Sequence, residues 1–308
     1  MLLSDRPLRL GTRGSPLALA QARMTARALC AVHGWPDEAV TIVTVQTSGD
    51  RIQDRALAEI GGKALWTKEL DRALVEGEID FAVHSMKDVE TLRPDAIRIA
   101  AMLPRADVRD RLVGADDFAA LPANPVVGTS SPRRAAQVKR LRPDATITLF
   151  RGNVATRLAK LAAGEVHATL LAAAGLDRLD QPDVGATVAI DVMLPAPSQG
   201  AVGIETLGDN VAMIEALGAI NDRDTCDAVM AERAVLKALG GTCHSPIAAL
   251  ARVDGENLHL IAEIISPDGQ ETVREETRLA RGDDKAAQAV GHALLGRASP
   301  ALRALFDT

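Results

Sequence analysis

The sequence predicts an α/β protein with two similar lobes of mixed, mostly parallel sheets, followed by a small α+β domain with a three-stranded antiparallel sheet. Three observations predict this fold class. Apolar runs of strand length alternate with amphipathic helical stretches from residue 8 to about residue 194, two motifs recur in the two halves of that region, and the pattern changes after Asn221. Such alternation is typical of α/β units, and 308 residues suffice for two or three domains.

Several runs before Asn221 have the composition of buried strands. They are short, aliphatic or β-branched, and bounded by turn residues, which favours strands over helices. We expect helices to fill the gaps between them. The runs are 40–45, 79–83, 97–101, 126–127, 146–150 and 168–171.

The two halves carry two matching motifs in the same order. In the first, a strand ends in Gly-Thr and a Ser-Pro pair begins a helix, at 11–21 and again at 128–137. In the second, a helix ends in Gly-Glu and leads into a buried strand, at 77–82 and at 164–169. Two lobes of one plan, hinged around a cleft, would explain both matches. Chance is the alternative, because the matching residues are partly common helix-capping chemistry.

The last part of the chain predicts a small separate domain. A helix at 222–239 and a Gly240-Gly241 loop precede strand-like runs, which are separated by the turn signals Asp254-Gly255 and Pro-Asp-Gly at 267–269. These signals favour tight turns between antiparallel strands. A last helix is expected at about 285–295, so the domain combines helices with a three-stranded antiparallel sheet.

Composition excludes several classes of function. The net charge of -6 gives no general basic field for nucleic acid or an acidic membrane, and aromatic residues, which supply base-stacking platforms, make up only 2% of the chain. Charged residues come early at the N-terminus, and no apolar run approaches the roughly 18 residues of a membrane span, so we expect a cytoplasmic protein. We also expect a monomer. The cysteines (Cys30, Cys226 and Cys243) are too few for a disulfide framework.

Arginines lie around the two Ser-Pro pairs and in nearby strand-to-helix loops. A Ser-Pro pair places a hydroxyl at a helix N-cap and proline at the first helical position, and the free backbone N–H groups attract anions. In a net acidic protein, arginines at the C-terminal edges of parallel strands favour a cleft for a small polyanion. An ordinary surface role is the alternative for any single one. They are Arg13, Arg133, Arg134, Arg151 and Arg157.

The segment 81–89 carries an apolar strand directly into a polar tip, where α/β folds commonly place function. In a cleft of arginines, Asp88 would remain ionised and could stabilise a developing cation or accept protons from a nitrogen. Two structural alternatives stay open: His84 as a structural histidine and Asp88 as a helix N-cap. Residues 47–70 include a Gly-Gly pair and lack periodicity in their first half, so they form either a mobile lid or a plain surface loop.

Cys243 lies in a loop that follows two glycines and ends near Pro246. An accessible thiol that faces basic residues could be thiolate-biased and nucleophilic. The alternative is a small buried apolar residue, which is the more common state of a lone cysteine. Cys30 and Cys226 lie in helical patterns and fit that alternative.

Taken together, these segments resemble the porphobilinogen deaminase family, in order and over nearly the whole chain. The matching motifs lie at 11–18, 49–70, 83–89, 128–134, 151–157, 174–178, 199–205 and 241–247. The resemblance implies two periplasmic-binding-protein-like lobes plus a third domain, with the chain returning to the first lobe at about 199–219. The implied domains are 1–102 with 199–219, 103–198, and 220–308.

The resemblance also implies an activity. Cys243 would carry a dipyrromethane through a thioether, which the enzyme assembles from its own substrate and keeps as a primer. Four porphobilinogens would then be added head to tail, each losing ammonia, and hydrolysis would release hydroxymethylbilane for tetrapyrrole (heme) biosynthesis. Asp88 is the implied catalytic carboxylate, with Lys87 beside it; it would hydrogen-bond pyrrole nitrogens and stabilise the azafulvene cation.

Other residues are implied to bind the acetate and propionate groups of the pyrroles. A charge-assisted hydrogen bond contributes about 1.5–3 kcal/mol, so a growing chain of carboxylates needs several arginines. No metal is expected. The implied cofactor-binding residues are Cys243, Ser85, Lys87, Asp88, Thr129, Ser130, Ser131, Arg133, Arg134, Arg151 and Gly152, the substrate-binding residues are Arg13, Ser15, Arg157, Arg178 and Gln199, and the lid residues are Lys63 and Trp66.

The sequence departs from the family pattern at a few positions, namely Ala64, Trp66, Glu90 and Val108, the last two in place of proline. None of these departures removes a charged catalytic position, so they concern loop rigidity and lid packing. Two other functions stay open. One is a non-catalytic anion-binding or sensor protein with the same two lobes, and the other is a hydrolase with Cys243 as its nucleophile.

Overall fold

The computed structural model describes residues 6–46, 67–241 and 245–306. The expected lid residues Lys63 and Trp66, the departure Ala64 and the expected anchor Cys243 lie outside these ranges. The chain forms two compact units: one holds the described residues of 1–106 and 200–226, the other those of 107–199 and 227–308. The three-domain division expected from the sequence stays a prediction.

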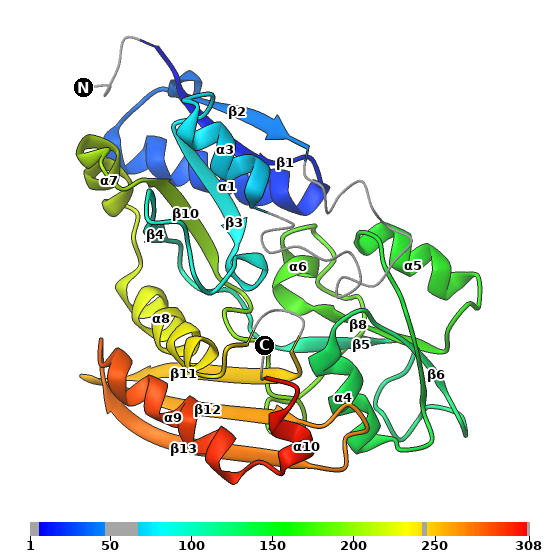
Figure 1. Cartoon of the computed structure of the whole chain (residues 1–308). Helices are drawn as coiled ribbons and strands as arrows, with labels where there is room; N and C mark the ends of the chain where they lie inside the picture. Colours follow the sequence, from blue (N-terminus) through cyan, green and yellow to red (C-terminus); the bar gives the residue numbers. More distant parts are fainter. Residues whose placement is uncertain (1–5, 47–66, 242–244, 307–308) are drawn as a thin grey trace. The chain divides into compact units, whose positions relative to one another are not determined.

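The first unit is built on a five-stranded mixed sheet (Figure 1). Its strand order is β2-β1-β3-β10-β4; β2 and β3 pair parallel with β1, and β10 lies antiparallel between β3 and β4. Because β10 comes from residues far down the chain, the return expected at about 199–219 reaches this sheet. The strands are β1 (Leu8–Arg13), β2 (Val40–Val45), β3 (Phe81–Ser85), β4 (Ile97–Met102) and β10 (Val202–Leu207).

Helices pack on this sheet and bury its apolar side chains. One core joins Leu10, Phe81 and Ile204 of the strands to Leu29 of the first helix, and all four are fully buried. A short 3-10 turn, η2 (Met86–Asp88), follows β3 directly. The other elements are α1 (Pro16–His33), η1 (Asp37–Ala39), α3 (Lys68–Val75) and α7 (Val211–Gly218).

The second unit contains a sheet with the same plan. Its order is β7-β6-β8-β5-β9; β7 and β8 pair parallel with β6, whereas β5 pairs antiparallel with β8 and β9. The strands are β5 (Asp110–Val113), β6 (Val126–Gly128), β7 (Thr146–Thr148), β8 (Ala168–Ala172) and β9 (Ala186–Thr187), and the helices are α4 (Pro132–Leu141), α5 (Val154–Ala162) and α6 (Ala173–Asp177).

The repeated sequence motifs occupy equivalent places in these two sheets. Ser15 caps α1 after β1, and Ser131 caps α4 after β6. Gly77 and Gly164 both have positive φ, which glycine adopts without strain, between a helix end and the strand that follows. The expected mixed sheets are confirmed, but the expectation that they are mostly parallel is wrong, because parallel and antiparallel pairings are equal in number in each sheet.

The expected three-stranded antiparallel sheet is also confirmed, in the order β11-β12-β13. Leu258, Leu260, Ala262 and Ile264 of β12 share a core with helices, while Ile261 packs with a cluster that includes Leu194. Side chains alternate along a strand, so the sheet is covered on both faces. Its elements are β11 (Ile247–Asp254), β12 (Asn257–Ile265) and β13 (Thr272–Ala280), with α8 (Arg223–Ala238), α9 (Asp284–Arg297) and α10 (Pro300–Arg303).

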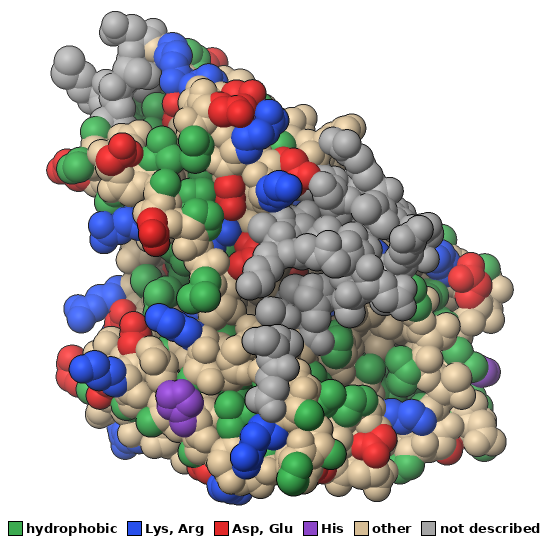
Figure 2. All heavy atoms as spheres, viewed as in Figure 1, with side chains coloured by type: hydrophobic (Ala, Val, Ile, Leu, Met, Phe, Trp, Pro, Cys, Tyr) green, Lys and Arg blue, Asp and Glu red, His purple; other side chains and the backbone are tan. Residues whose placement is uncertain are grey.

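None of the helices in the described part of the chain is long and apolar enough to cross a membrane. Figure 2 shows basic and acidic side chains interspersed over the described part of one face. This distribution matches the small negative net charge of the sequence.

Candidate active site

The polar tip of β3 is the first part of the candidate site. Ser85 ends the strand, and its hydroxyl lies 2.8 Å from Nε2 of Gln21 on α1. Lys87 and Asp88 follow in η2, both half-buried. Asp88 is the last residue of this turn rather than its N-cap, so the capping alternative is wrong. Among the described residues, none hydrogen-bonds to the Asp88 carboxylate or pairs with it.

A buried ion cluster lies close to this turn in the chain. We call it the Arg93 cluster; its members are Arg93, Glu205, Glu90, Asp71 and Thr67. The guanidinium of Arg93 donates to both carboxylate oxygens of Glu205 on β10, at 2.8 and 2.9 Å, to Glu90 at 2.9 Å and to Asp71 on α3 at 2.5 Å. Thr67 donates a further hydrogen bond to Glu90 at 2.7 Å. The cluster therefore ties the segment after Asp88 to the start of α3 and to the sheet.

The charges of the Arg93 cluster perturb one another. Burial alone would raise the pKa of Glu205, but His84 and Arg93 outweigh it and lower the pKa to about 2. Burial raises the pKa of Asp71 and outweighs the opposing effect of Arg93. His84 Nε2 lies 3.1 Å from Oε2 of Glu205, although the ring N–H is not aligned for a hydrogen bond. His84 is buried in this cluster, as expected for a structural histidine.

The cluster also explains one departure from the family pattern. Glu90 stands where proline is common, and its carboxylate bridges Thr67 and Arg93. Ion pairing thus restrains the turn in place of a proline ring. Gly203 is required nearby, because a Cβ at this position of β10 would overlap the side chain of Met86 in η2.

Arg13 and Ser15 lie where β1 leads into α1. Arg13 is the last residue of the strand and is half-buried. The Ser15 hydroxyl accepts a hydrogen bond from the backbone N–H of Ala18 at 3.2 Å, as an N-cap residue does. Ser15 therefore has a structural role that the sequence already predicted, and Arg13 stands beside the same helix end.

The equivalent helix end in the second unit holds the predicted hydroxyl cluster. Ser131 accepts from the backbone N–H of Arg134 at 3.4 Å, and Thr129 accepts from the backbone N–H of Ser131 at 3.1 Å. Ser130 lies between them and is half-buried. The start of α4 is thus an ordered turn whose N–H groups could serve an anion.

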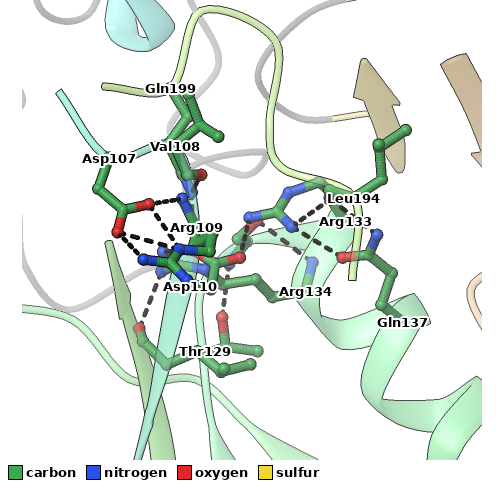
Figure 3. Close-up of polar contacts among 12 residues, drawn as sticks. Asp107, Val108, Arg109, Asp110, Thr129, Arg133, Arg134, Gln137, Leu194 and Gln199 are labelled. Carbon is green, nitrogen blue, oxygen red and sulfur yellow. Dashed lines mark hydrogen bonds and ion pairs between the residues drawn. The ribbon is translucent and has the colours of Figure 1, made fainter. Parts of the chain in front are cut away.

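Arg133 and Arg134 do not lie on the surface; Figure 3 shows their side chains directed at Asp110. Both are buried and point at the carboxylate of Asp110 on β5, each donating from Nη2 at 2.7 Å. Arg133 also donates from Nη1 to the Gln137 side chain at 2.8 Å and to the Leu194 carbonyl at 2.9 Å. The surface alternative for these two arginines is wrong, and much of their hydrogen bonding is internal.

Asp110 is the centre of this arrangement, which we call the Asp110 cluster. Gln199 also donates to its carboxylate, at 2.9 Å, and to the Val108 carbonyl at 2.8 Å. Burial alone would raise the pKa of Asp110, but the two guanidinium groups outweigh it and hold the pKa far below its usual range. The two Nε2 hydrogens of Gln199 thus have acceptors within the protein, and its expected role in substrate binding stays a prediction.

The Asp110 cluster still has capacity to bind an anion. Two arginines face one carboxylate, which leaves a net positive charge. An arginine has five N–H donors; three of Arg133 and two of Arg134 are used. Within the described ranges, the buried Nε of each has no acceptor. Buried polar groups are normally hydrogen-bonded, so each of these Nε donors lacks the acceptor that a buried donor usually has.

The remaining predicted residues also belong to the second unit. Arg151 is nine-tenths buried beyond β7. Gly152 has φ of 117°, and Arg157 at the start of α5 donates from Nε to its carbonyl at 3.0 Å. Arg178 follows α6, and burial lowers its pKa. The structure thus brings Arg133, Arg134 and Gln199 together around Asp110, and Arg157 beside Gly152.

Sequence reasoning missed Asp110. It lies in a charged stretch, Arg-Ala-Asp-Val-Arg-Asp, that is typical of an exposed loop. In the structure, Asp110 begins β5, pairs with Ala172 of β8, and is buried. The available signal was the presence of two adjacent arginines at a helix start, which require an acidic partner when buried.

Two family models together match most of the chain. The model described as "Porphobilinogen deaminase, dipyromethane cofactor binding domain" matches residues 8–215, and "Porphobilinogen deaminase, C-terminal domain" matches residues 226–297. A protein named porphobilinogen deaminase from Sphingopyxis alaskensis is 57% identical over 310 residues, covering 99% of this chain and 98% of the relative. One of the same name from Paracoccus denitrificans is 50% identical over 300 residues, covering 96% and 95%.

Solved structures of substrate-binding domains are also similar, at low identity. The GlnP substrate binding domain 2 of Lactococcus lactis gives a TM-score of 0.43 at 12% identity, covering 78% of this chain and 93% of its own. A substrate binding domain of a putative amino acid ABC transporter from Streptococcus pneumoniae gives 0.42 at 12% identity, covering 76% and 95%. These scores are too low to carry an argument, whereas the sequence matches decide: the chain belongs to the porphobilinogen deaminase family.

Proposed function

We propose that the chain is a transferase that joins four porphobilinogen molecules head to tail on a tethered dipyrromethane and releases hydroxymethylbilane. One observation carries the proposal. The family model for the dipyrromethane-binding domain covers residues 8–215, and this range contains every candidate site residue except Cys243. The remaining candidate, Cys243, falls in the range of the C-terminal model.

The second unit fits the carboxylates of the cofactor. When bound, the dipyrromethane supplies the pyrrole carbon to which the first substrate is joined. The Asp110 cluster offers a net positive charge and buried arginine N–H groups without acceptors in the described chain, which suit acetate and propionate groups. The residues proposed to hold the cofactor in this unit are Thr129, Ser130, Ser131, Arg133, Arg134, Arg151 and Gly152.

Asp88 is proposed to act on the reacting pyrrole. In each condensation, the aminomethyl carbon of the incoming pyrrole loses ammonia and bonds to a ring carbon of the growing chain, which loses a proton. A fixed carboxylate stabilises the positive charge that develops as ammonia leaves and accepts hydrogen bonds from pyrrole N–H groups. The half-buried carboxylate of Asp88 at the tip of β3 suits this role, and Ser85, which ends β3, and Lys87, which lies within the turn, are proposed as further donors.

The incoming pyrrole also brings carboxylates that need donors. We propose that Arg13, Arg157 and Arg178 bind them. Ser15 would contribute through the capped start of α1, and Gln199 through its hydrogen bond to Asp110. Lys63, Trp66 and Cys243 keep their expected roles as lid and anchor. The three-domain division, a monomeric state and a cytoplasmic location complete the proposal.

Product stoichiometry tests the proposed reaction. The purified chain is incubated with porphobilinogen, and ammonia and hydroxymethylbilane are measured together. We expect four ammonia molecules per bilane released. Asp88→Ala should lose nearly all turnover and retain the folded state, whereas Asp95→Ala, at an exposed position of the same unit, should match the wild type. Porphobilinogen binding without ammonia release would instead indicate the non-catalytic anion-binding alternative.

A further inference from the structure

A chain of buried polar side chains links the Asp110 cluster to the three-stranded sheet within the second unit. Arg133 donates to Oε1 of Gln137 at 2.8 Å, and Gln137 Nε2 donates to Oε1 of Glu263 at 2.9 Å. Gln137 lies one turn after Arg133 on α4, and Glu263 lies on β12. The link therefore runs from β5 through a helix to the sheet of the C-terminal region.

The Gln137 amide can lie in one direction only. Arginine has donors and no acceptor, so the amide oxygen must face Arg133. A carboxylate accepts, so the amide nitrogen faces Glu263 and also donates to the Leu194 carbonyl at 2.9 Å. With Glu263 in place, the oxygen of Gln137 is always presented to Arg133. Without that acceptor, the amide loses one of the contacts that fix it.

Glu263 is an unusual residue for its place in the sheet. Its strand neighbours Ala262 and Ile264 are buried apolar residues, and Glu263 itself is 0% exposed. Arg140 pairs with it at 3.3 Å, and Arg274 lies 3.9 Å away. A buried ion pair is rarely a better source of stability than apolar packing, so sheet stability alone does not account for an acidic side chain here.

We propose that Glu263 is a positioning residue for Arg133, acting through Gln137. It fixes the guanidinium so that Nε and one Nη2 hydrogen, which have no acceptor among the described residues, stay aligned for a pyrrole carboxylate. This inference rests on the proposed function, since it needs Arg133 to bind such carboxylates. The sheet that follows the cysteine loop in the chain thus helps to shape the carboxylate site.

Two variants at one position separate this role from a general structural one. Glu263→Leu removes the acceptor at similar volume, while Glu263→Gln keeps an oxygen that can accept from Gln137. Glu276→Leu is the matched control, because Glu276 lies on β13 and pairs with His259 at 2.7 Å. For each variant we measure KM and kcat. We also measure, after reconstitution with limiting porphobilinogen, the fraction of the chain that carries a mass increment of two pyrrole units.

We expect kcat/KM to fall about tenfold in Glu263→Leu, mainly through kcat and a lower loaded fraction, because Arg133 is proposed to hold the cofactor rather than the incoming pyrrole. Glu263→Gln and the control should stay within about twofold of wild type. Wild-type values in Glu263→Leu, or an equal loss in Glu263→Gln, would overturn the inference. If Glu263→Leu fails to fold, Gln137→Met breaks the same link, and wild-type values in that variant would also overturn it.

Arg133→Leu separates the two proposals. If Arg133→Leu keeps normal turnover and loading, both the role of Arg133 and this inference fail. If Arg133→Leu is impaired while Glu263→Leu is not, only the positioning role of Glu263 fails. A further test combines the two: in an Arg133→Leu background, Glu263→Leu should cause no additional loss of kcat/KM, and independent losses would contradict action through Arg133.

Discussion

Replacement of Asp110 by asparagine is the sharpest test of the buried cluster. The carboxylate of Asp110 accepts hydrogen bonds at 2.7 Å from both Arg133 and Arg134 and one at 2.9 Å from Gln199. Asparagine keeps the shape but offers one acceptor oxygen, and its NH2 group faces an arginine donor. Removing one partner of a buried ion pair costs about 3–5 kcal/mol, so Asp110→Asn should destabilise the fold by that amount.

Thermal unfolding measures this loss. In a chain of this size, each kcal/mol corresponds to about 2–4 °C, so the midpoint should fall by roughly 10 °C. The matched control is Asp116→Asn, an exposed aspartate of the same unit, which should change the midpoint by less than about 2 °C. A midpoint for Asp110→Asn that is indistinguishable from this control would refute the assignment of Asp110 as counterion of the two arginines.

Three further changes test the first unit. Arg93→Met leaves three acidic side chains of its cluster without their common partner, so the free energy of unfolding should fall by about 3–5 kcal/mol. The pKa of Glu205 is lowered to about 2 in the folded state. The ionised Glu205 therefore contributes its full share to the free energy of unfolding above about pH 5, and this share is lost as the pH falls toward 2. Glu205→Gln should make the free energy of unfolding less dependent on pH in that window. The added Cβ in Gly203→Ala overlaps Met86, so this variant should lower kcat and lower the free energy of unfolding by about 1–3 kcal/mol. Gly218→Ala is the control, because the space around Gly218 is open, and it should have neither effect.

Much of the fold could be predicted from local sequence. The run 40–45 coincides with β2, and turn signals at Asp254-Gly255 and 267–269 separate the strands of the C-terminal sheet. Ser15 and Ser131 cap helices because the signal for a cap lies within a few residues. Local periodicity and capping chemistry therefore determine these elements.

The pairing of distant segments was harder to predict. β10 lies within the first sheet although 99 residues separate it from β4 along the chain, and only the family resemblance indicated that return. β5 and the two-residue β9 were missed, because such short strands gain their stability from neighbouring strands rather than from their own composition.

The candidate site shows the same limit. The sequence identified Asp88 at a strand tip and arginines near helix starts, since each follows from one local motif. It could not identify their partners: Asp110 for Arg133 and Arg134, or Glu205 for Arg93. Those pairs join residues from different strands and helices, and burial that results from the complete fold decides them.

The mass of the intact purified chain tests the central claim most directly. Wild type should carry an increment equal to two pyrrole units, and Cys243→Ser should lack it. Cys226→Ser, which changes a cysteine of α8, should keep the increment. A wild-type chain that is unmodified yet turns over porphobilinogen would contradict a tethered dipyrromethane on Cys243.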